Sequence, residues 1–235
     1  MGGLGKGNGI NDITQLGYAR IAGCSLLVII LSSTLSNNLV VEDASATAHN
    51  ILAHELQFRI GLVGETIMLN SDVVLAVALY ALLKPVNGIL ALLGAFWRIA
   101  NATVLGVGVV VSLAALHVLH DAQYLTAFKM DQMQAIVRQW LTMHGAGMLI
   151  GLIFFGLGAA THSYLFWKSR YIPRFLAACY LVVALQVVVC CFLILLFPSL
   201  DAIIDPWFIV PDFVVELAVA LRLTIKGADI RPQPA

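Results

Sequence analysis

Two long apolar stretches, 56–83 and 86–119, each carry an ionisable side chain far from either end. Asp72 lies twelve residues before the turn at 84–87, and Arg98 lies eleven residues after it. At about 1.5 Å per helical residue, both side chains lie roughly 16–18 Å from that turn. Ionisable groups within hydrocarbon usually face the interior of a helix bundle and pair there. We therefore expect an ion pair between Asp72 and Arg98 near the middle of a membrane.

Other polar residues reach a similar depth, so the pair is expected to belong to a larger cluster. Glu216 lies nine residues before the end of a later apolar stretch at 225, or about 14 Å from the same membrane face. Glu65 shares a helix face with Asp72, and Asp212 shares one with Glu216, because both spacings are close to whole turns. The predicted cluster consists of Glu65, Asp72, Arg98, Asn101, Asp212 and Glu216.

Two interpretations of this cluster stay open. In the first, it is a binding site for a ligand, an ion or a proton inside the bundle. In the second, it is a structural network in which Arg98 satisfies Asp72 and Glu216 and thereby fixes the helix positions. One arginine against two carboxylates leaves a negative excess, which favours a cation, a proton or a further partner.

Three histidines near the other end of the apolar stretches suggest metal chemistry. His117 and His120 lie three residues apart on one helix turn, and His144 opens the next apolar stretch at similar depth. With Glu65 they offer nitrogen and oxygen ligands that suit zinc, iron or copper. The spacing lacks the His-Glu-x-x-His pattern of metalloproteases, so solvent contact or helix capping is the alternative. No other cofactor is expected.

The elements that position these residues are transmembrane helices, as the composition indicates. The 235 residues are 60% hydrophobic and 11% charged, and the mean hydropathy is +0.93. A soluble domain is far more polar, so we predict a polytopic membrane protein that is surrounded by lipid. The net charge of zero excludes the basic surface that nucleic-acid binding requires.

Hydropathy predicts an all-α fold, namely a bundle of six transmembrane helices with two short amphipathic helices at the outer face. The predicted transmembrane helices cover 15–35, 56–83, 86–119, 143–167, 173–197 and 207–225. The amphipathic helices cover 42–55 and 121–142, outside the hydrocarbon. We expect one transmembrane domain at 15–227, between a flexible N-terminal tail at 1–14 and a C-terminal tail at 228–235.

The loop charges orient these predicted helices. If the helices alternate in direction, nine of the 13 basic residues fall on one side of the membrane. Lysine and arginine mark the cytoplasmic side, so we predict a multi-pass protein of the bacterial cytoplasmic membrane with both termini in the cytoplasm. The nine residues are Lys6, Arg20, Lys84, Lys168, Arg170, Arg174, Arg222, Lys226 and Arg231.

Several short stretches carry a resemblance to a known family. They are ARIAG at 19–23, LLKPVN at 82–87, FWRI at 96–99, GLIFFGLG at 151–158 and KSRYIPR at 168–174. With these stretches the chain resembles, over 18–227, an uncharacterised bacterial membrane family catalogued as domain of unknown function 4386. The resemblance implies a six-helix membrane protein without an assigned activity. Members of that family often have a glutamate three residues after this arginine, where the present chain has Asn101.

The leading functional hypothesis is binding or permeation of a small ligand, ion, proton or lipid within the bundle. One alternative is an intramembrane metalloenzyme that uses the three histidines. Another is an accessory subunit of a larger membrane complex, and a homo-oligomer is also compatible with the sequence. Whether the protein is an enzyme stays open at this point.

Overall fold

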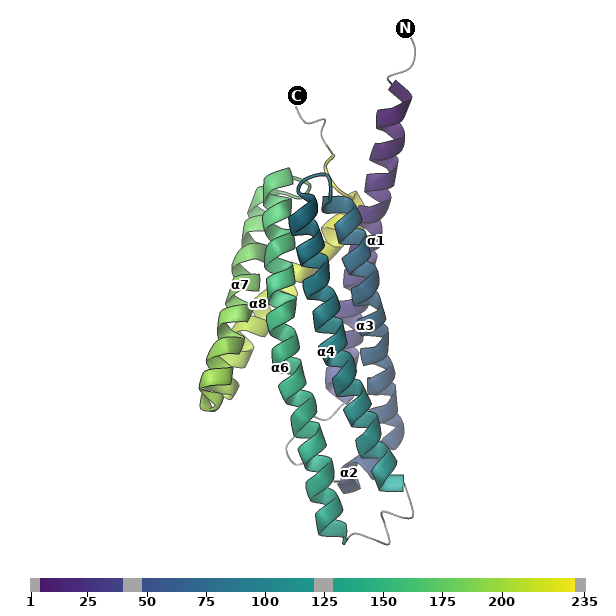
Figure 1. Cartoon of the computed structure of the whole chain (residues 1–235), viewed down its shortest axis with the longest axis vertical. Coiled ribbons are helices and arrows are strands. Elements are labelled where there is room, and N and C mark those ends of the chain that lie inside the picture. The colour runs from purple at the N-terminus through teal and green to yellow at the C-terminus, as the bar shows by residue number, and fades with distance from the viewer. Residues whose placement is uncertain (1–4, 40–47, 121–128, 231–235) are drawn as a thin grey trace.

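The computed structural model describes residues 5–39, 48–120 and 129–230, which form helices and short turns with no strand among them (Figure 1). The all-α prediction is confirmed for this part of the chain. In chain order the elements are α1 (Gly5–Leu39), α2 (Ala48–Ala53), α3 (Glu55–Leu83), α4 (Gly88–His120), α6 (Met130–Ser169), α7 (Arg174–Leu196), the 3-10 helix η1 (Pro198–Leu200) and α8 (Asp201–Lys226).

Five of these helices are long and apolar enough to cross a membrane. The α8 helix has 26 residues but is not among the five, because charged residues recur along its whole length. The candidate spans are Thr14–Ser36, Glu55–Leu83, Gly88–His120, Gln132–Ser169 and Arg174–Leu196.

The long helices close into a ring. The α1 helix packs against α3, α3 against α4, α4 against α6, α6 against α7, and α7 against α8. The α8 helix then returns to α1, running obliquely behind the other helices in Figure 1. Helices that follow one another in the chain are thus neighbours in space, as short connections require. The contact between α8 and α1 brings the last long helix against the first. A side chain that points inward from one helix therefore faces several others.

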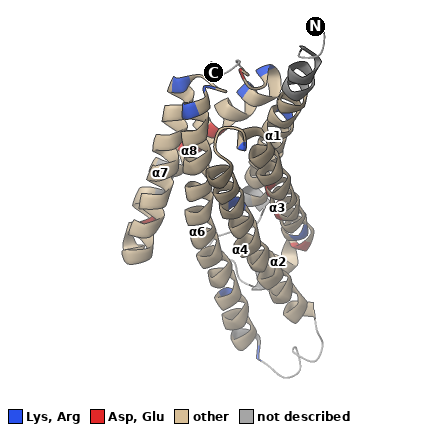
Figure 2. Ribbon diagram, turned by 45° about the horizontal axis from the view of Figure 1, so that its top comes forward, with Lys and Arg blue, Asp and Glu red and all other residues tan. Residues whose placement is uncertain are grey.

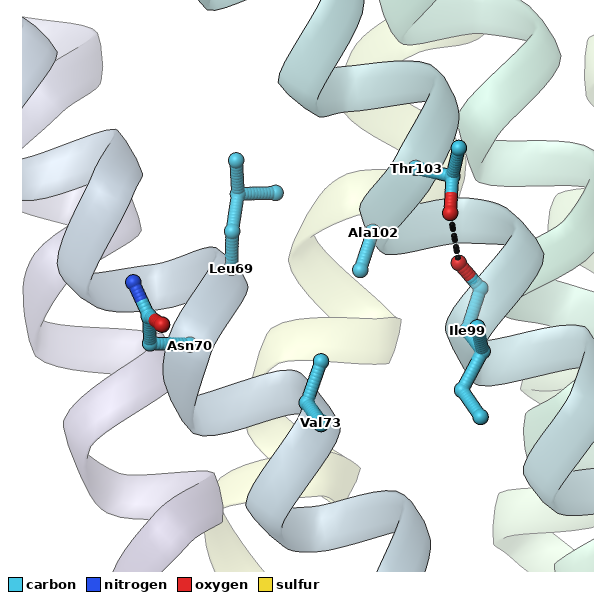
Figure 3. A pocket seen from close by; sticks show the side chains of 6 residues that line it. All are labelled: Leu69, Asn70, Val73, Ile99, Ala102 and Thr103. Carbon is cyan, nitrogen blue, oxygen red and sulfur yellow. Dashed lines mark hydrogen bonds between the residues drawn. The ribbon is translucent and has the colours of Figure 1, made fainter.

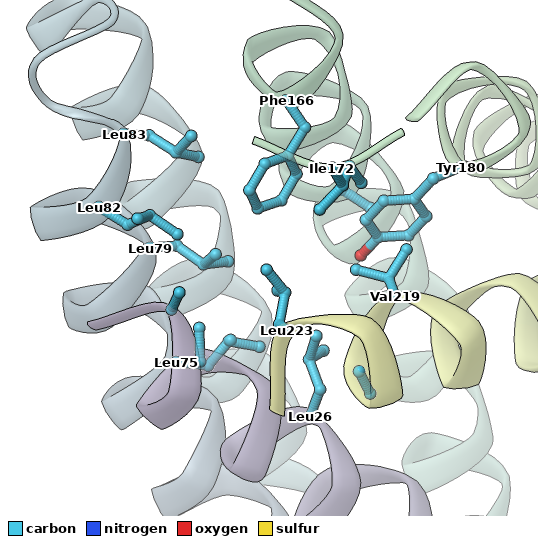
Figure 4. Packing of buried hydrophobic residues seen from close by; sticks show 14 of the residues in the cluster. Leu26, Leu75, Leu79, Leu82, Leu83, Phe166, Ile172, Tyr180, Val219 and Leu223 are labelled. Carbon is cyan, nitrogen blue, oxygen red and sulfur yellow. The ribbon is translucent and has the colours of Figure 1, made fainter. Parts of the chain in front are cut away.

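The contact that closes this ring depends on a glycine. A Cβ atom on Gly23 of α1 would lie 2.5 Å from the backbone nitrogen of Thr224 and 2.9 Å from the carbonyl oxygen of Ala220, both in α8. Only a residue without a side chain permits so close an approach. Figure 4 shows the apolar core beside this contact, with side chains from α1, α3, α6, α7 and α8, among them Leu26, Leu75, Leu79, Phe166, Tyr180, Val219 and Leu223.

The outer segments differ from the sequence-based expectation. Residues 130–142, predicted as part of a separate amphipathic helix, continue directly into the following span in the 40-residue α6. No glycine or proline interrupts the stretch before Gly145, so helical hydrogen bonding continues past the limit of the apolar region. The described part of 42–55 holds only the six-residue α2 and the start of α3. Residues 40–47 and 121–128 lie outside the described residues.

Described residues near both ends of the chain belong to helices or contact them. The α1 helix begins at Gly5, within the segment predicted as a tail. At the other end, the amide of Asp229 donates to the carbonyl of Tyr171, and Arg222 pairs with the Asp229 carboxylate at 2.7 Å. These contacts tie the described C-terminal residues to the α6–α7 turn and to the end of α8.

Candidate functional site

Arg98 lies at the centre of the ring, with only 1% of its surface exposed. Its Nη1 donates to Oδ1 of Asp72 in α3 at 2.9 Å, and its Nη2 donates to Oε1 of Glu216 in α8 at 3.3 Å. The Nδ2 of Asn101, one turn along α4, donates to the other oxygen of Asp72 at 2.9 Å. The predicted contact between Asp72 and Arg98 is therefore confirmed, and both Asn101 and Glu216 join it.

Aromatic side chains surround this network. The Arg98 guanidinium carbon lies 4.7 Å from the ring centre of Phe155 in α6, which suits a cation–π contact. The fully buried Tyr180 of α7 lies beside Arg98 and Glu216. The sequence analysis did not identify either residue, because an aromatic residue in an apolar stretch cannot be distinguished by sequence from one that only packs in the hydrophobic core. With them, α3, α4, α6, α7 and α8 all contribute to the surroundings of one guanidinium.

Acidic groups outnumber the arginine in this site. Asp212 lies one turn before Glu216 on α8, and its Oδ1 is buried with no hydrogen-bond partner among the described residues. The same holds for Nε of Arg98 and Oδ1 of Asn101. Arg98 pairs with Asp72 and Glu216, and Asp212 lies one turn from Glu216 without an ion pair to the guanidinium, so three carboxyl groups surround one cation. Buried polar atoms without a protein partner are rare in folded proteins, and a bound water or ion commonly satisfies them.

Glu65, the remaining member of the predicted cluster, belongs to a separate group. His144 of α6 places its Nε2 3.5 Å from Oε1 of Glu65, and its Nδ1 lies 3.0 Å from the hydroxyl of Ser112 in α4. All three side chains are buried. A Cβ atom on Gly108 would lie 3.1 Å from the same Nδ1, so this glycine makes room for the imidazole. His144 is therefore held from α3 and α4 at once.

The three histidines proposed as metal ligands do not gather at one point. The Nε2 of His120 lies 3.1 Å from Oε2 of Glu55, on an exposed surface. His117 is exposed as well, whereas His144 is buried beside Glu65. Within the described ranges, no group of three or more His, Cys, Asp or Glu side chains is arranged to hold a metal ion.

His162 is a further buried residue that the sequence analysis did not place in a site. Its side chain is 0% exposed, and both ring nitrogens lack a hydrogen-bond partner among the described residues. A Cβ atom on Gly94 of α4 would lie 2.5 Å from its Nε2, so the ring fills the space that this glycine leaves open. Its spacing of 18 residues from His144, or five helical turns, was the available signal in the sequence.

A crevice of about 190 Å³ opens between α3 and α4 at the depth of Asp72 and Arg98 (Figure 3). The hydroxyl of Thr103 donates to the carbonyl of Ile99 at 2.8 Å, so this side chain is satisfied within its own helix. Asp72 and Asn101 do not line the crevice, which is separate from the buried network. Its lining residues are Leu69, Asn70, Val73, Ile99, Ala102 and Thr103.

Comparisons with known proteins give a family but no activity. A family model described as "Domain of unknown function (DUF4386)" matches residues 21–227, which confirms the resemblance seen in the sequence. The chain is similar to an uncharacterised protein of Archaeoglobus fulgidus, at 28% identity over 175 residues, which are 71% of this chain and 83% of that protein. No solved structure matches the chain.

Proposed function

This chain belongs to the family described as domain of unknown function (DUF4386), and we propose that its helix bundle binds a small cation or a proton and conducts it across the membrane. The binding site in this proposal is the network of Arg98, Asp72 and Glu216 with Asn101 and Asp212. The ring of helices supplies the shell, and the polar side chains supply the only charged groups near its centre among the described residues.

The charge balance of the site carries this proposal. Asp72, Glu216 and Asp212 offer three carboxyl groups, and Arg98 offers one positive charge, so at most one carboxylate is balanced by the guanidinium. An uncompensated charge inside a low-dielectric bundle is costly, so the site gains stability by taking up positive charge. A proton or a small cation is such a charge. The buried Oδ1 of Asp212, which lacks a partner among the described residues, is a suitable acceptor for it.

We further propose that α8 is a sixth membrane crossing and that both termini lie in the cytoplasm. Its polar middle, with Asp212 and Glu216, faces the ring, while Val210 and Val214 are exposed in the manner of lipid-facing residues. In Figure 2 the basic residues gather mainly at the end of the bundle near the C-terminus. Such a concentration of lysine and arginine supports a cytoplasmic location for that end.

Reconstitution into liposomes tests the proposed function. The wild-type protein is expected to carry a current or a dye-detected flux of protons or of Na⁺ or K⁺ under an imposed membrane potential. Glu216→Gln and Asp212→Asn are expected to lower that flux at least about tenfold, because each removes a carboxyl group that can bind the cation or the proton. Asp201→Asn, at an exposed position on the same helix, is the matched control.

Two results would contradict the proposal. Wild-type protein that carries none of these ions would favour the accessory-subunit hypothesis, which the copurification of partner proteins tests. The same flux in all three variants, Glu216→Gln, Asp212→Asn and the Asp201→Asn control, would mean that ions do not pass through the Arg98 site.

A further inference from the structure

Two buried histidines lie at opposite ends of one polar seam between α4 and α6. His144 and His162 are 18 residues apart on α6, which is five turns, so both rings emerge from the same helix face. The separation along the axis is about 27 Å, close to the ~30 Å thickness of the hydrocarbon core. Phe155, which contacts Arg98, lies between them on the same helix. The two imidazoles therefore bracket the Arg98 site.

The facing side of α4 is built to receive these rings. Gly94 and Ser112 are also 18 residues apart, and Gly94 makes room for His162 as Gly108 does for His144. Arg98 and Asn101 lie between the two glycines on the same face of α4. The seam thus carries polar groups at three levels, with an imidazole at each outer level and the Arg98 network in the middle.

The two imidazoles have different surroundings, and each ring offers a nitrogen for proton transfer. His144 is faced by the carboxylate of Glu65 from α3 and by the hydroxyl of Ser112 from α4. His162 is faced by the cationic Arg98, one turn beyond Gly94, and both its ring nitrogens lack a partner among the described residues. The guanidinium charge and the full burial oppose a charged imidazolium there, so His162 can pass a proton on only by accepting one as it releases another. A neutral imidazole accepts a proton at one nitrogen and, once protonated, releases one from the other.

Apolar packing separates the outer histidine from the centre. A Cβ atom on Gly151 of α6 would lie 2.8 Å from Cδ2 of Leu105 and 3.1 Å from Oδ1 of Asn101. Leu105 therefore fills the seam between the level of Asn101 and the level of His144. The apolar Leu105 side chain offers no oxygen ligand to replace the hydration shell of a metal cation at this level. A proton needs only a transient hydrogen bond or one water molecule.

We propose that the seam conducts protons, with His144 and His162 as the exchange groups on the two sides of the Arg98 site. This inference rests on the proposed function and narrows it to one permeant. In each step an N–H bond forms on one imidazole nitrogen and another breaks, and a carboxylate of the central site holds the proton in between. No redox change occurs, and the proton gradient drives net transfer.

Proton flux into liposomes that contain a pH-sensitive dye tests the inference, with valinomycin and K⁺ setting the membrane potential. We expect His144→Gln and His162→Gln each to lower the proton flux at least about tenfold, since glutamine cannot exchange a proton at these positions. His120→Gln, at an exposed histidine, is the control and should conduct like wild type. Leu105→Ala should raise the proton flux and should not admit Na⁺, with the increase lost in the double variant with His144→Gln.

The outcomes separate this inference from the proposed function. Loss of flux in Glu216→Gln but not in either histidine variant would contradict proton conduction along the seam. Ion binding at the central site would still agree with that result. A wild-type flux of Na⁺ or K⁺ in place of protons would likewise contradict proton conduction. Thermal unfolding of each variant in detergent identifies a folding failure. If His162→Gln does not fold, the comparison of Leu105→Ala with the double variant Leu105→Ala, His144→Gln tests the inference instead. A misfolded protein would not gain a proton-selective flux that His144→Gln then removes.

Discussion

At the scale of single residues, Arg98 links α4 to α3 and α8 through its two ion pairs and to α6 through Phe155. Arg98→Ala would leave Asp72 and Glu216 buried without their cation, and removal of one partner from such a pair costs about 3–5 kcal/mol. We predict a loss of that size in the free energy of unfolding, measured with denaturant in mixed micelles. Arg59→Ala is the control, because Arg59 pairs with Glu55 at 2.6 Å on an exposed surface. It should cost only about 0.2–1 kcal/mol.

Equal losses in the two variants would contradict this role of Arg98. They would mean that the buried network adds no more to stability than a surface pair does.

The residues of the central site were largely predictable, and their rotation about the helix axis was not. Distance from a shared turn gave the pairing of Asp72 with Arg98, because depth depends only on the rise per residue. The same argument placed the histidines only by depth. His117 is exposed and His144 is buried because helix rotation is set by packing, which residue counts do not supply.

At the scale of elements, the approach of α1 to α8 gives a matched pair of glycine substitutions. Gly23→Ala places a Cβ atom 2.5 Å from the backbone of α8, which cannot move as a side chain does. We predict a loss of about 1–3 kcal/mol in unfolding free energy, as overpacking usually causes. Gly17→Ala, with nothing within 4 Å, should be neutral or stabilising by up to about 1 kcal/mol, because alanine favours the helix.

Thermal unfolding of both variants in the same detergent measures the difference. A Gly23→Ala protein at least as stable as Gly17→Ala would mean that α1 and α8 do not approach each other as closely as the structure places them.

Helix limits were the least predictable feature at this scale. Hydropathy located the apolar spans, yet α6 continues for 40 residues because nothing in 130–142 breaks a helix. The charges of α8 had the opposite effect, since the carboxylates that face the ring also lower its apolar character. In both cases the apolar pattern reports contact with lipid, whereas the helix itself follows local backbone preferences and packing.

At the scale of the whole molecule, the proposed orientation predicts which residues reach each side of the membrane. In a protein with Cys24, Cys179, Cys190 and Cys191 replaced by alanine, we introduce one cysteine at Asp201 or at Lys226, both exposed ends of α8. An impermeant maleimide applied to intact cells should label the cysteine at 201 and not the one at 226. Labelling at 226, or at both positions, would contradict a sixth crossing with a cytoplasmic C-terminus.

The central claim is that the buried network serves ion passage and is more than a structural support. Proton and cation flux through the triple variant Asp72→Leu, Arg98→Met, Glu216→Met tests this most directly. Replacing a buried ion network by apolar residues of similar size is often neutral or stabilising, so this variant is expected to fold. We predict an unfolding free energy at or above that of the wild type together with the loss of flux. A folded triple variant that conducts like the wild type would contradict the claim.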